Sequence, residues 1–138
     1  MKVVNSVFPN ADQLKHFMTA AEDGPFVMVN LLKFKPKAEY ADGSDADLSG
    51  AAAYARYGVE VAKLLAKQGG RIVYSGAVTN LMVGECDPSW DAVALAEYPS
   101  FADFRAMVTS SEYQAIEKHR LAGLAGQLNI RTKGASGG

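Results

Sequence analysis

Two adjacent residues near the end of the chain, His119 and Arg120, have side chains that could carry out chemistry. A neutral imidazole can act as a general base near neutral pH, because its ordinary pKa is about 6.5. The planar guanidinium of Arg120 suits a carboxylate or an enolate oxygen. We therefore treat both residues as candidate catalytic groups.

Each of the two also has a structural interpretation. On the predicted helix that contains Tyr113, Arg120 falls on the apolar side, where a charged group needs a partner. That partner could be Glu97 or Asp91 in a structural ion pair. His119 could be a half-buried histidine bonded to the backbone. No second His or Cys stands at ligand spacing, so the sequence predicts neither a metal site nor a bound cofactor.

Four further residues are candidates for binding a ligand: Asn30, Tyr54, Tyr57 and Trp90. Asn30 is a polar residue in an otherwise apolar segment, and its amide needs partners if it is buried. A tyrosine hydroxyl can donate to a ligand oxygen, and the single tryptophan could form the wall of a pocket for a flat molecule. Packing explains the tyrosines equally well, and Trp90 could instead be a core or dimer-interface residue.

Apolar patterns predict the elements that position these residues. Asn10 and Gln13 form a predicted capping box that begins a helix, and Gly24-Pro25 ends it. Residues 26–34 form a strand that is apolar on both faces and contains Asn30. Ser49 begins the helix that carries the two tyrosines.

The second half of the chain alternates in the same way. Strands are predicted at 71–84 and 90–98, and a helix capped by Ser100 follows. The spacing of Ser111 and its Gln three residues later predicts that a helix restarts there, before a last strand at 127–132.

After the first helix, the predicted order is β-α-β-β-α-β, which is the ferredoxin-like arrangement of the α+β class. We expect one domain over residues 1–132, with 133–138 as a flexible tail. The helices can cover only one face of the four-stranded antiparallel sheet, and the other face is still apolar. Two copies packing sheet to sheet would bury it, so we expect a homodimer that forms an α/β barrel.

Composition restricts the classes of partner. The chain has 138 residues, of which 49% are hydrophobic, and its net charge is −1. This charge provides no bulk attraction to nucleic acid or to an anionic membrane. No apolar run approaches the roughly 18 residues needed to span a bilayer. The single cysteine, Cys86, cannot form an internal disulfide, which favours a reducing cytoplasm.

The connection from residue 35 to residue 50 is polar and rich in acids. Its acids do not follow the spacing of a calcium loop. Loops of this length are often lids, and a solvated loop is the simpler interpretation.

Five segments together resemble the domain-of-unknown-function family numbered 1330, over roughly residues 25–128: PFVMVNLLKFK, AYARYGVEVAKLL, GGRIVYSG, WDAVALAEYPSFADFRAM and SSEYQAIEKHRLAGL. The resemblance implies the ferredoxin-like fold and the dimeric α/β barrel, and it implies no reaction. Relatives in that superfamily include cofactor-free oxygenases, haem-degrading enzymes, small isomerases and ligand-sensing domains. Asn30, Trp90 and His119 resemble the Asn, Trp and His of the haem-degrading members, but here the histidine lies far downstream, in the last helix.

These observations predict a protein that binds a small molecule in a barrel pocket. It would be a cofactor-free enzyme of the oxygenase or isomerase type, acting on a small carbonyl or aromatic metabolite by proton transfer or oxygenation. The alternative is a non-catalytic ligand-binding or stress-response module, because no nucleophile, metal set or cofactor motif is legible. Whether Arg120 faces the pocket, and whether the 35–50 connection closes over it, stay open at this stage.

Overall fold

The computed structural model describes residues 1–19 and 24–134 of the chain. In chain order its elements are α1 (Ala11–Thr19), β1 (Phe26–Phe34), α2 (Gly50–Lys67), β2 (Arg71–Ala77), β3 (Ala92–Tyr98), α3 (Phe101–Val108), α4 (Ser111–Gly123) and β4 (Leu124–Thr132). The sheet has the strand order β2-β3-β1-β4, and neighbouring strands are antiparallel. This confirms the predicted ferredoxin-like α+β fold.

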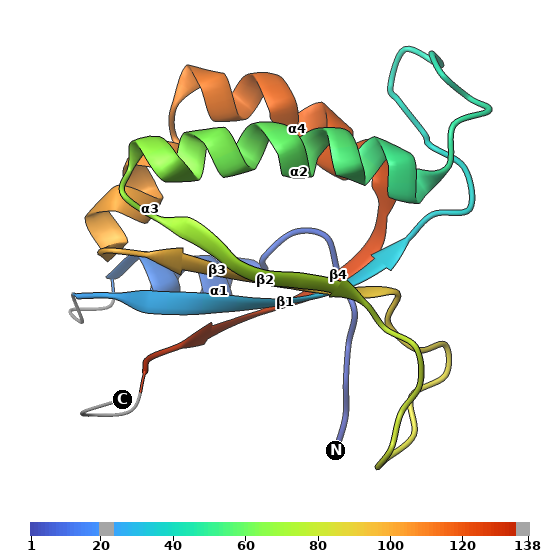
Figure 1. The fold of residues 1–138 in the computed structure, drawn as a ribbon, viewed down its shortest axis with the longest axis horizontal. Coiled ribbons are helices and arrows are strands. Elements are labelled where there is room, and N and C mark those ends of the chain that lie inside the picture. The colour runs from blue at the N-terminus through green and yellow to red at the C-terminus, as the bar shows by residue number, and fades with distance from the viewer. Residues whose placement is uncertain (20–23, 135–138) are drawn as a thin grey trace.

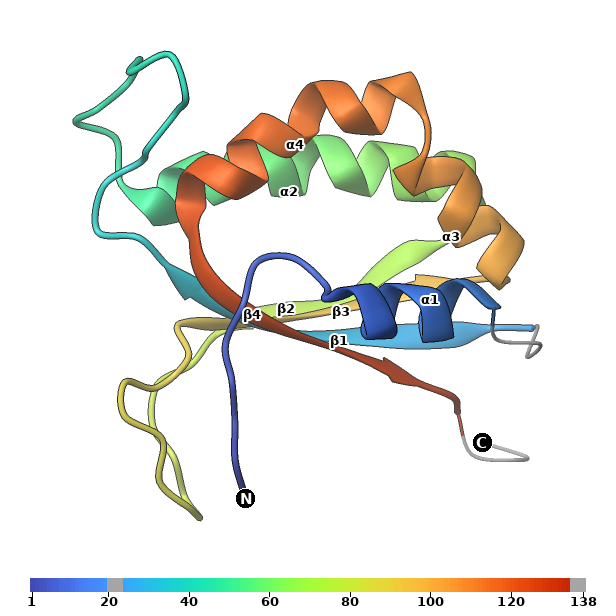
Figure 2. The same cartoon turned by 180° about the vertical axis from the view of Figure 1, so that it is seen from behind.

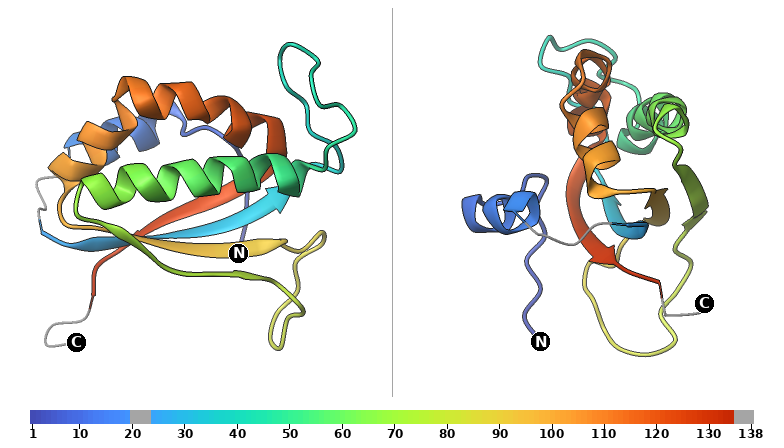
Figure 3. Two further views of the ribbon diagram at one scale, coloured as in Figure 1. Left: turned by 45° about the horizontal axis from the view of Figure 1, so that its top comes forward. Right: turned by 90° about the vertical axis from the view of Figure 1, so that its left-hand side faces the viewer.

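The helices form a layer on one side of the sheet. Helices α2 and α4 lie side by side over one face, whereas α1 lies beside the β4 edge (Figures 1 and 2). The view along the layers shows no helix over the opposite face in the described part of the chain (Figure 3). None of the helices in residues 1–19 and 24–134 has the length and apolar character of a membrane-spanning segment.

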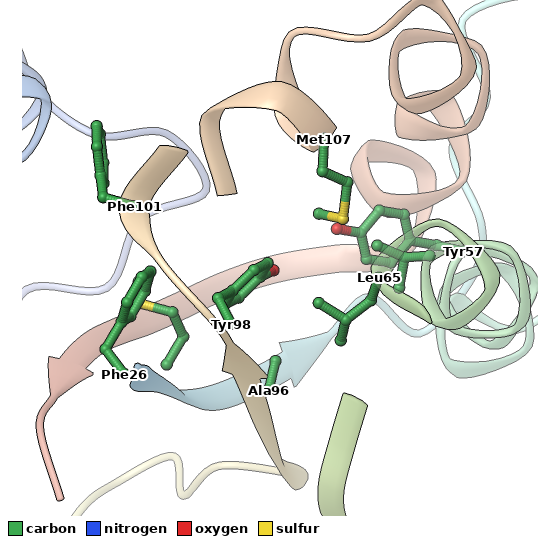
Figure 4. Close-up of a cluster of buried hydrophobic side chains, with 9 residues drawn as sticks. Phe26, Tyr57, Leu65, Ala96, Tyr98, Phe101 and Met107 are labelled. Atoms are coloured by element: carbon green, nitrogen blue, oxygen red, sulfur yellow. The ribbon is translucent and has the colours of Figure 1, made fainter. Parts of the chain in front are cut away.

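The core lies between the sheet and the helix layer. Alternate residues of β1 and β3 point into it, as their apolar patterns predict. They meet apolar side chains from α2 and α3 in one buried cluster: Phe26, Met28, Tyr57, Val61, Leu65, Ala96, Tyr98, Phe101 and Met107. Figure 4 shows most of these side chains.

The opposite face of the sheet, called the open face here, is also apolar. Val29 of β1 lies across from Leu95 of β3 and from Ile130 of β4, and Leu31 lies across from Val93. Cross-strand partners share a face of a sheet, so these side chains form one continuous patch. The prediction that β1 is apolar on both faces is therefore confirmed.

Polar side chains fix the starts of the helices. Asn10 Oδ1 accepts the Gln13 N–H at 2.8 Å, and Gln13 Oε1 accepts the Asn10 N–H at 3.0 Å, so the predicted capping box is present. Ser49 caps α2 as predicted. The cap of α4 is Ser110, not Ser111, because the Ser110 hydroxyl accepts the N–H three residues further on. α1 is described as far as Thr19, and residues 20–23, which precede the predicted Gly24-Pro25 end, lie outside the described residues, as do residues 135–138 of the predicted tail.

The boundaries of three strands differ from those predicted. β2 ends at Ala77 instead of Gly84, and β3 begins at Ala92 instead of Trp90. The Val78 N–H still bonds the Asp91 carbonyl at 2.9 Å. Beyond this point the chain leaves the sheet as a loop on the side of the open face (Figures 1 and 2). β4 begins three residues early, at 124, because α4 runs into it without a connecting loop.

The connection between β1 and α2 is fixed to the helix layer. The Ala38 N–H donates to the Leu48 carbonyl at 2.7 Å, and the Glu39 N–H donates to the Ala122 carbonyl at 3.0 Å. Ala38 is buried in a small cluster with Ala53 and Ala122. Ala38 and Glu39 therefore anchor this segment to the ends of α2 and α4, whereas residues 41–47 are exposed and form the solvated loop of the simpler interpretation (Figure 1).

Gly123 allows α4 to approach the start of α2, and Gly50 allows the start of α2 to approach the backbone of Lys35. A Cβ on Gly123 would overlap the carbonyl oxygen of Gly50 and would lie 2.8 Å from the Tyr54 nitrogen. The Gly123 carbonyl accepts the Lys35 N–H at 2.8 Å, and the Gly50 N–H donates to the Lys35 carbonyl at 3.1 Å. The end of β1 and the start of α2 are thus hydrogen-bonded around the end of α4.

We expect Gly123→Ala to lower the free energy of unfolding by about 2 kcal/mol or more, because the added methyl meets backbone atoms that cannot give way. The matched control is Gly58→Ala in the middle of α2, where an added Cβ has no neighbour within 4 Å. That variant should gain up to about 1 kcal/mol from helix propensity. Urea unfolding measures both, and equal effects of the two substitutions would contradict the close approach.

Candidate functional site

Three polar side chains form a hydrogen-bonded relay on the helix-facing side of the sheet: Asn30, Gln127 and Arg120. Arg120 Nη2 donates to Gln127 Oε1 at 2.6 Å, and Gln127 Nε2 donates to Asn30 Oδ1 at 2.7 Å. Asn30 Nδ2 then donates to the backbone carbonyls of Ala94, at 3.1 Å, and Met28, at 3.3 Å. Each amide in this polar relay is oriented by its neighbour, so the relay holds the guanidinium in one place.

Arg120 faces the sheet and does not form the structural ion pair considered from the sequence. Glu97 pairs with Arg71 at 3.2 Å, and Asp91 pairs with Lys33 at the same distance. Arg120 instead donates to the Val7 carbonyl at 2.7 Å. Among residues 1–19 and 24–134, no carboxylate lies within 4.0 Å of its guanidinium. The cation is therefore half-buried with neutral partners only.

Four tyrosines form a second group beside the relay, called the tyrosine cluster here: Tyr54, Tyr57, Tyr98 and Tyr113. The hydroxyls of Tyr57 and Tyr113 are hydrogen-bonded at 3.0 Å, and the rings of Tyr54 and Tyr57 lie 5.3 Å apart. Figure 4 shows Tyr57 reaching from α2 and Tyr98 from β3 into the region between the sheet and the helices.

Burial controls the ionisation of this cluster. It raises the pKa of Tyr54 to about 12, and the nearby charge of Arg120 opposes the rise. Burial also raises the pKa of Tyr57 well above its ordinary value, and it raises the pKa values of Tyr98 and Tyr113. All four side chains are therefore neutral hydroxyls near pH 7, and Arg120 lies close enough to act on three of them.

Two hydroxyls of the cluster lack a protein partner. Within the described residues, Tyr54 and Tyr98 form no hydrogen bond through their hydroxyls. In the same ranges, Ser89 Oγ is the one fully shielded side-chain oxygen or nitrogen that lacks a partner. Each of the two tyrosine hydroxyls therefore keeps some contact with solvent.

The structure separates the six residues predicted from the sequence. Asn30, Tyr54, Tyr57 and Arg120 lie together between the sheet and the helices. His119 points the other way, and its Nδ1 lies 2.6 Å from the Tyr40 hydroxyl on the outer side of the helix layer. Trp90 is half-buried in the loop before β3. The structure therefore does not bring His119 and Arg120 together, and the single site expected from the sequence stays a prediction.

Sequence reasoning missed Gln127, Tyr98 and Tyr113. Gln127 is 8% exposed and is the one buried polar or charged residue in the described part of the chain. Its signal was present, because a strand with Leu128 on one face must place Gln127 on the other, with Asn30. No sequence pattern identified Tyr113, because its place in the cluster depends on a hydrogen bond to Tyr57, 56 positions away.

A model of a domain of unknown function, DUF1330, matches residues 44–131 of the chain, which is more than half of its length. The chain belongs to the DUF1330 family. The resemblance described from the sequence is thus confirmed. No curated protein matches the chain.

Solved structures agree with this family and fold. The methylated RPA0582 protein is 33% identical, with a TM-score of 0.87 over 99% of each chain. The RPA0582 protein of unknown function from Rhodopseudomonas palustris is 32% identical, with a TM-score of 0.85 over 96% of this chain and 99% of that one. A dabb family protein from Mesorhizobium loti is 11% identical, with a TM-score of 0.52 over 82% and 99%. A dimeric protein from Bacteroides fragilis is 14% identical, with a TM-score of 0.51 over 80% and 96%. The last two share the ferredoxin-like fold alone.

The chemistry available to this DUF1330 site is that of hydrogen-bond donors. A guanidinium and neutral tyrosine hydroxyls stabilise an oxygen that carries or develops negative charge. None of these groups is a general base near pH 7, since each tyrosine pKa is raised. Within the described residues, no group of three or more His, Cys, Asp or Glu side chains is placed to hold a metal ion.

Because the pKa of Tyr54 is raised, the free energy of unfolding should decrease at alkaline pH. Its folded pKa is about 12 and its ordinary value is 10.0. Between these values the unfolded chain binds fewer protons than the folded one, so stability falls as pH rises. From pH 7 to pH 11, wild type should lose about 1 kcal/mol more than Tyr54→Phe, which has no phenol to ionise. Urea unfolding at both pH values measures this difference, and the pH 7 pair serves as the control. Equal losses in the two proteins would contradict it.

Proposed function

We propose that this DUF1330 protein binds a small planar metabolite through an anionic oxygen, with Arg120 as the binding residue. The observation that carries the proposal is the half-buried guanidinium without a carboxylate partner among the described residues. A charge in such a place is costly unless it is paired. A carboxylate or enolate of a ligand would supply the missing partner.

The tyrosine cluster supports the same ligand class. The free hydroxyl of Tyr54 provides a neutral donor near the cation, Tyr98 adds a second free hydroxyl further along β3, and their rings suit a flat apolar body. An open groove at the end of β1 is lined in part by Phe34, whose ring lies 5.4 Å from that of Tyr54. No residue of the tyrosine cluster lines this groove, and we propose it as the route by which a ligand would approach Tyr54 past Phe34.

The enzymatic form of the proposal is a cofactor-free oxygenation or an isomerisation through an enolate. The donor set would lower the free energy of that enolate. The second candidate is ligand binding without turnover. It is favoured by the raised pKa values of the tyrosines, which leave the site without a base of its own near pH 7.

We further propose that the protein acts as a homodimer, joined through the open face. Val29, Leu31, Val93 and Leu95 lie there on neighbouring strands, and no helix of the described chain covers them. An apolar sheet face of this kind is typical of an interface between two copies. The Bacteroides fragilis protein of the same fold is dimeric.

Val29→Glu tests the dimer. Two carboxylates buried without partners at the interface should convert the dimer to a monomer, because each desolvated charge costs several kcal/mol. Val59→Glu is the matched control, since Val59 is 59% exposed on α2, in the helix layer. Sedimentation velocity at micromolar concentration should find a dimer for wild type and control, and a monomer for Val29→Glu. A monomeric wild type would refute the proposal.

Arg120→Met tests the ligand site. We expect small aromatic and 2-oxo carboxylates, such as salicylate and phenylpyruvate, to bind wild type at least about tenfold more tightly than their neutral amides. Arg120→Met should lose this preference, because methionine fills the space without the charge. Arg105→Met, on the exposed side of α3, should retain it. Isothermal titration calorimetry measures each affinity, and an unchanged preference in Arg120→Met would place the ligand elsewhere.

A further inference from the structure

A second group of polar side chains lies on the outer side of the helix layer, away from the sheet. It surrounds a recess of about 280 Å³, lined by the 40–45 segment, by Arg56 of α2 and by Lys118 and His119 of α4. We call this the outer recess. Neither the relay nor the tyrosine cluster contributes a residue to its lining, so the function proposed above does not use it.

One side-chain hydrogen bond connects His119 to the 40–45 segment. Arg56 Nη1 lies 3.3 Å from the Tyr40 hydroxyl and can only donate to it. We assign the Tyr40 proton to the bond with His119 Nδ1, at 2.6 Å. A neutral imidazole that accepts at Nδ1 carries its own proton on Nε2. Within the described residues that Nε2–H has no hydrogen-bond partner, so it is a free donor at the recess.

The acids of the recess are already occupied. Asp42 accepts from the Ser44 N–H at 2.9 Å and from the Ser44 hydroxyl at 2.6 Å. Asp45 pairs with Arg56 at 2.9 Å. Lys118, in contrast, has no carboxylate within 4.0 Å in the ranges that the structure describes. The charge of Lys118 helps to lower the pKa of Asp42, but the two groups form no ion pair. The recess therefore contains an ammonium group without an ion-pair partner beside the imidazole of His119.

The charges around His119 act on its pKa. Burial lowers its pKa, and the charges of Lys118 and Arg56 lower it further, against a smaller opposite effect of Glu60. The charged and titratable groups around the ring are thus Tyr40, Asp42 and Asp45 of the loop, Arg56 and Glu60 of α2, and Lys118 of α4. Their combined effect at the imidazole is that of positive charge, which disfavours a proton and attracts an anion.

We propose that the outer recess is a binding site for a small oxyanion, such as a phosphate or carboxylate group of a metabolite. Lys118 Nζ and His119 Nε2 bind the anion directly. Arg56 also lines the recess, and its donors that are not engaged with Tyr40 and Asp45 would supply the third contact. Tyr40 fixes the tautomer that makes Nε2 a donor and is a positioning residue.

Such a site couples anion binding to the protonation of His119. An anion beside the ring stabilises the imidazolium, so a bound anion must raise the pKa of His119. The chain has two histidines, and His16 lies on α1, outside the recess. His16 is therefore an internal control in the same sample.

The experiment is an NMR titration of the two histidine rings in sodium sulfate and in sodium chloride at equal ionic strength. Sulfate is the probe because it keeps its charge over this pH range. We expect sulfate to raise the titration midpoint of His119 by about 0.5 pH unit or more, and to leave that of His16 unchanged. Lys118→Ala should abolish the effect of sulfate, and Lys15→Ala, on α1, should preserve it. Both lysines are exposed, so neither variant is expected to unfold.

Three results would overturn the proposal. Identical His119 curves in the two salts would overturn the proposal, as would a sulfate effect that survives in Lys118→Ala. Equal shifts of His16 and His119 would identify a general salt effect and would also overturn it. Because Arg120 is not part of the readout, failure here leaves the ligand site under the helices untouched.

Discussion

The close backbone approach of Gly50 and Gly123 is the constraint on which the remaining geometry depends. It brings the first turn of α2 against the last turn of α4, and both glycines bond to the end of β1 through Lys35. Because α4 continues directly into β4 at Leu124, this contact also sets where β4 begins. The two helices, and with them Tyr54, are therefore placed relative to the sheet by backbone contacts that no larger residue could make.

One face of the sheet is turned toward the helices and the other is the open face. β1 contributes residues to both faces. Asn30 points toward the helices and is part of the polar relay, whereas Val29 and Leu31 point to the open face. The period of two along a strand thus lets three consecutive residues contribute to the polar relay and to the open face. A polar residue in the centre of the sheet is tolerated because each of its amide groups has a partner.

Local patterns predicted most of the fold, whereas the site depends on contacts between distant segments. The alternation of β1 identified Asn30, and helical spacing identified Arg120 as a charge on an apolar side. The partners of Arg120 could not be predicted, because Val7 belongs to a segment without periodicity and Gln127 depends on the register between β1 and β4. The same reason applies to His119, whose partner lies in an irregular loop.

His119 and Arg120 are consecutive residues on α4, about 100° apart around the helix axis, and they reach opposite sides of the helix layer. One turn of one helix is therefore shared by the outer recess and the polar relay. If a ligand bound in the outer recess or beside the polar relay shifts or rotates this turn, it changes the affinity for a ligand at the other of these two sites. By thermodynamic reciprocity, the ligand at the second site must change the binding free energy at the first site by the same amount. The helix that carries both residues would then serve as the mechanical link of a two-site protein.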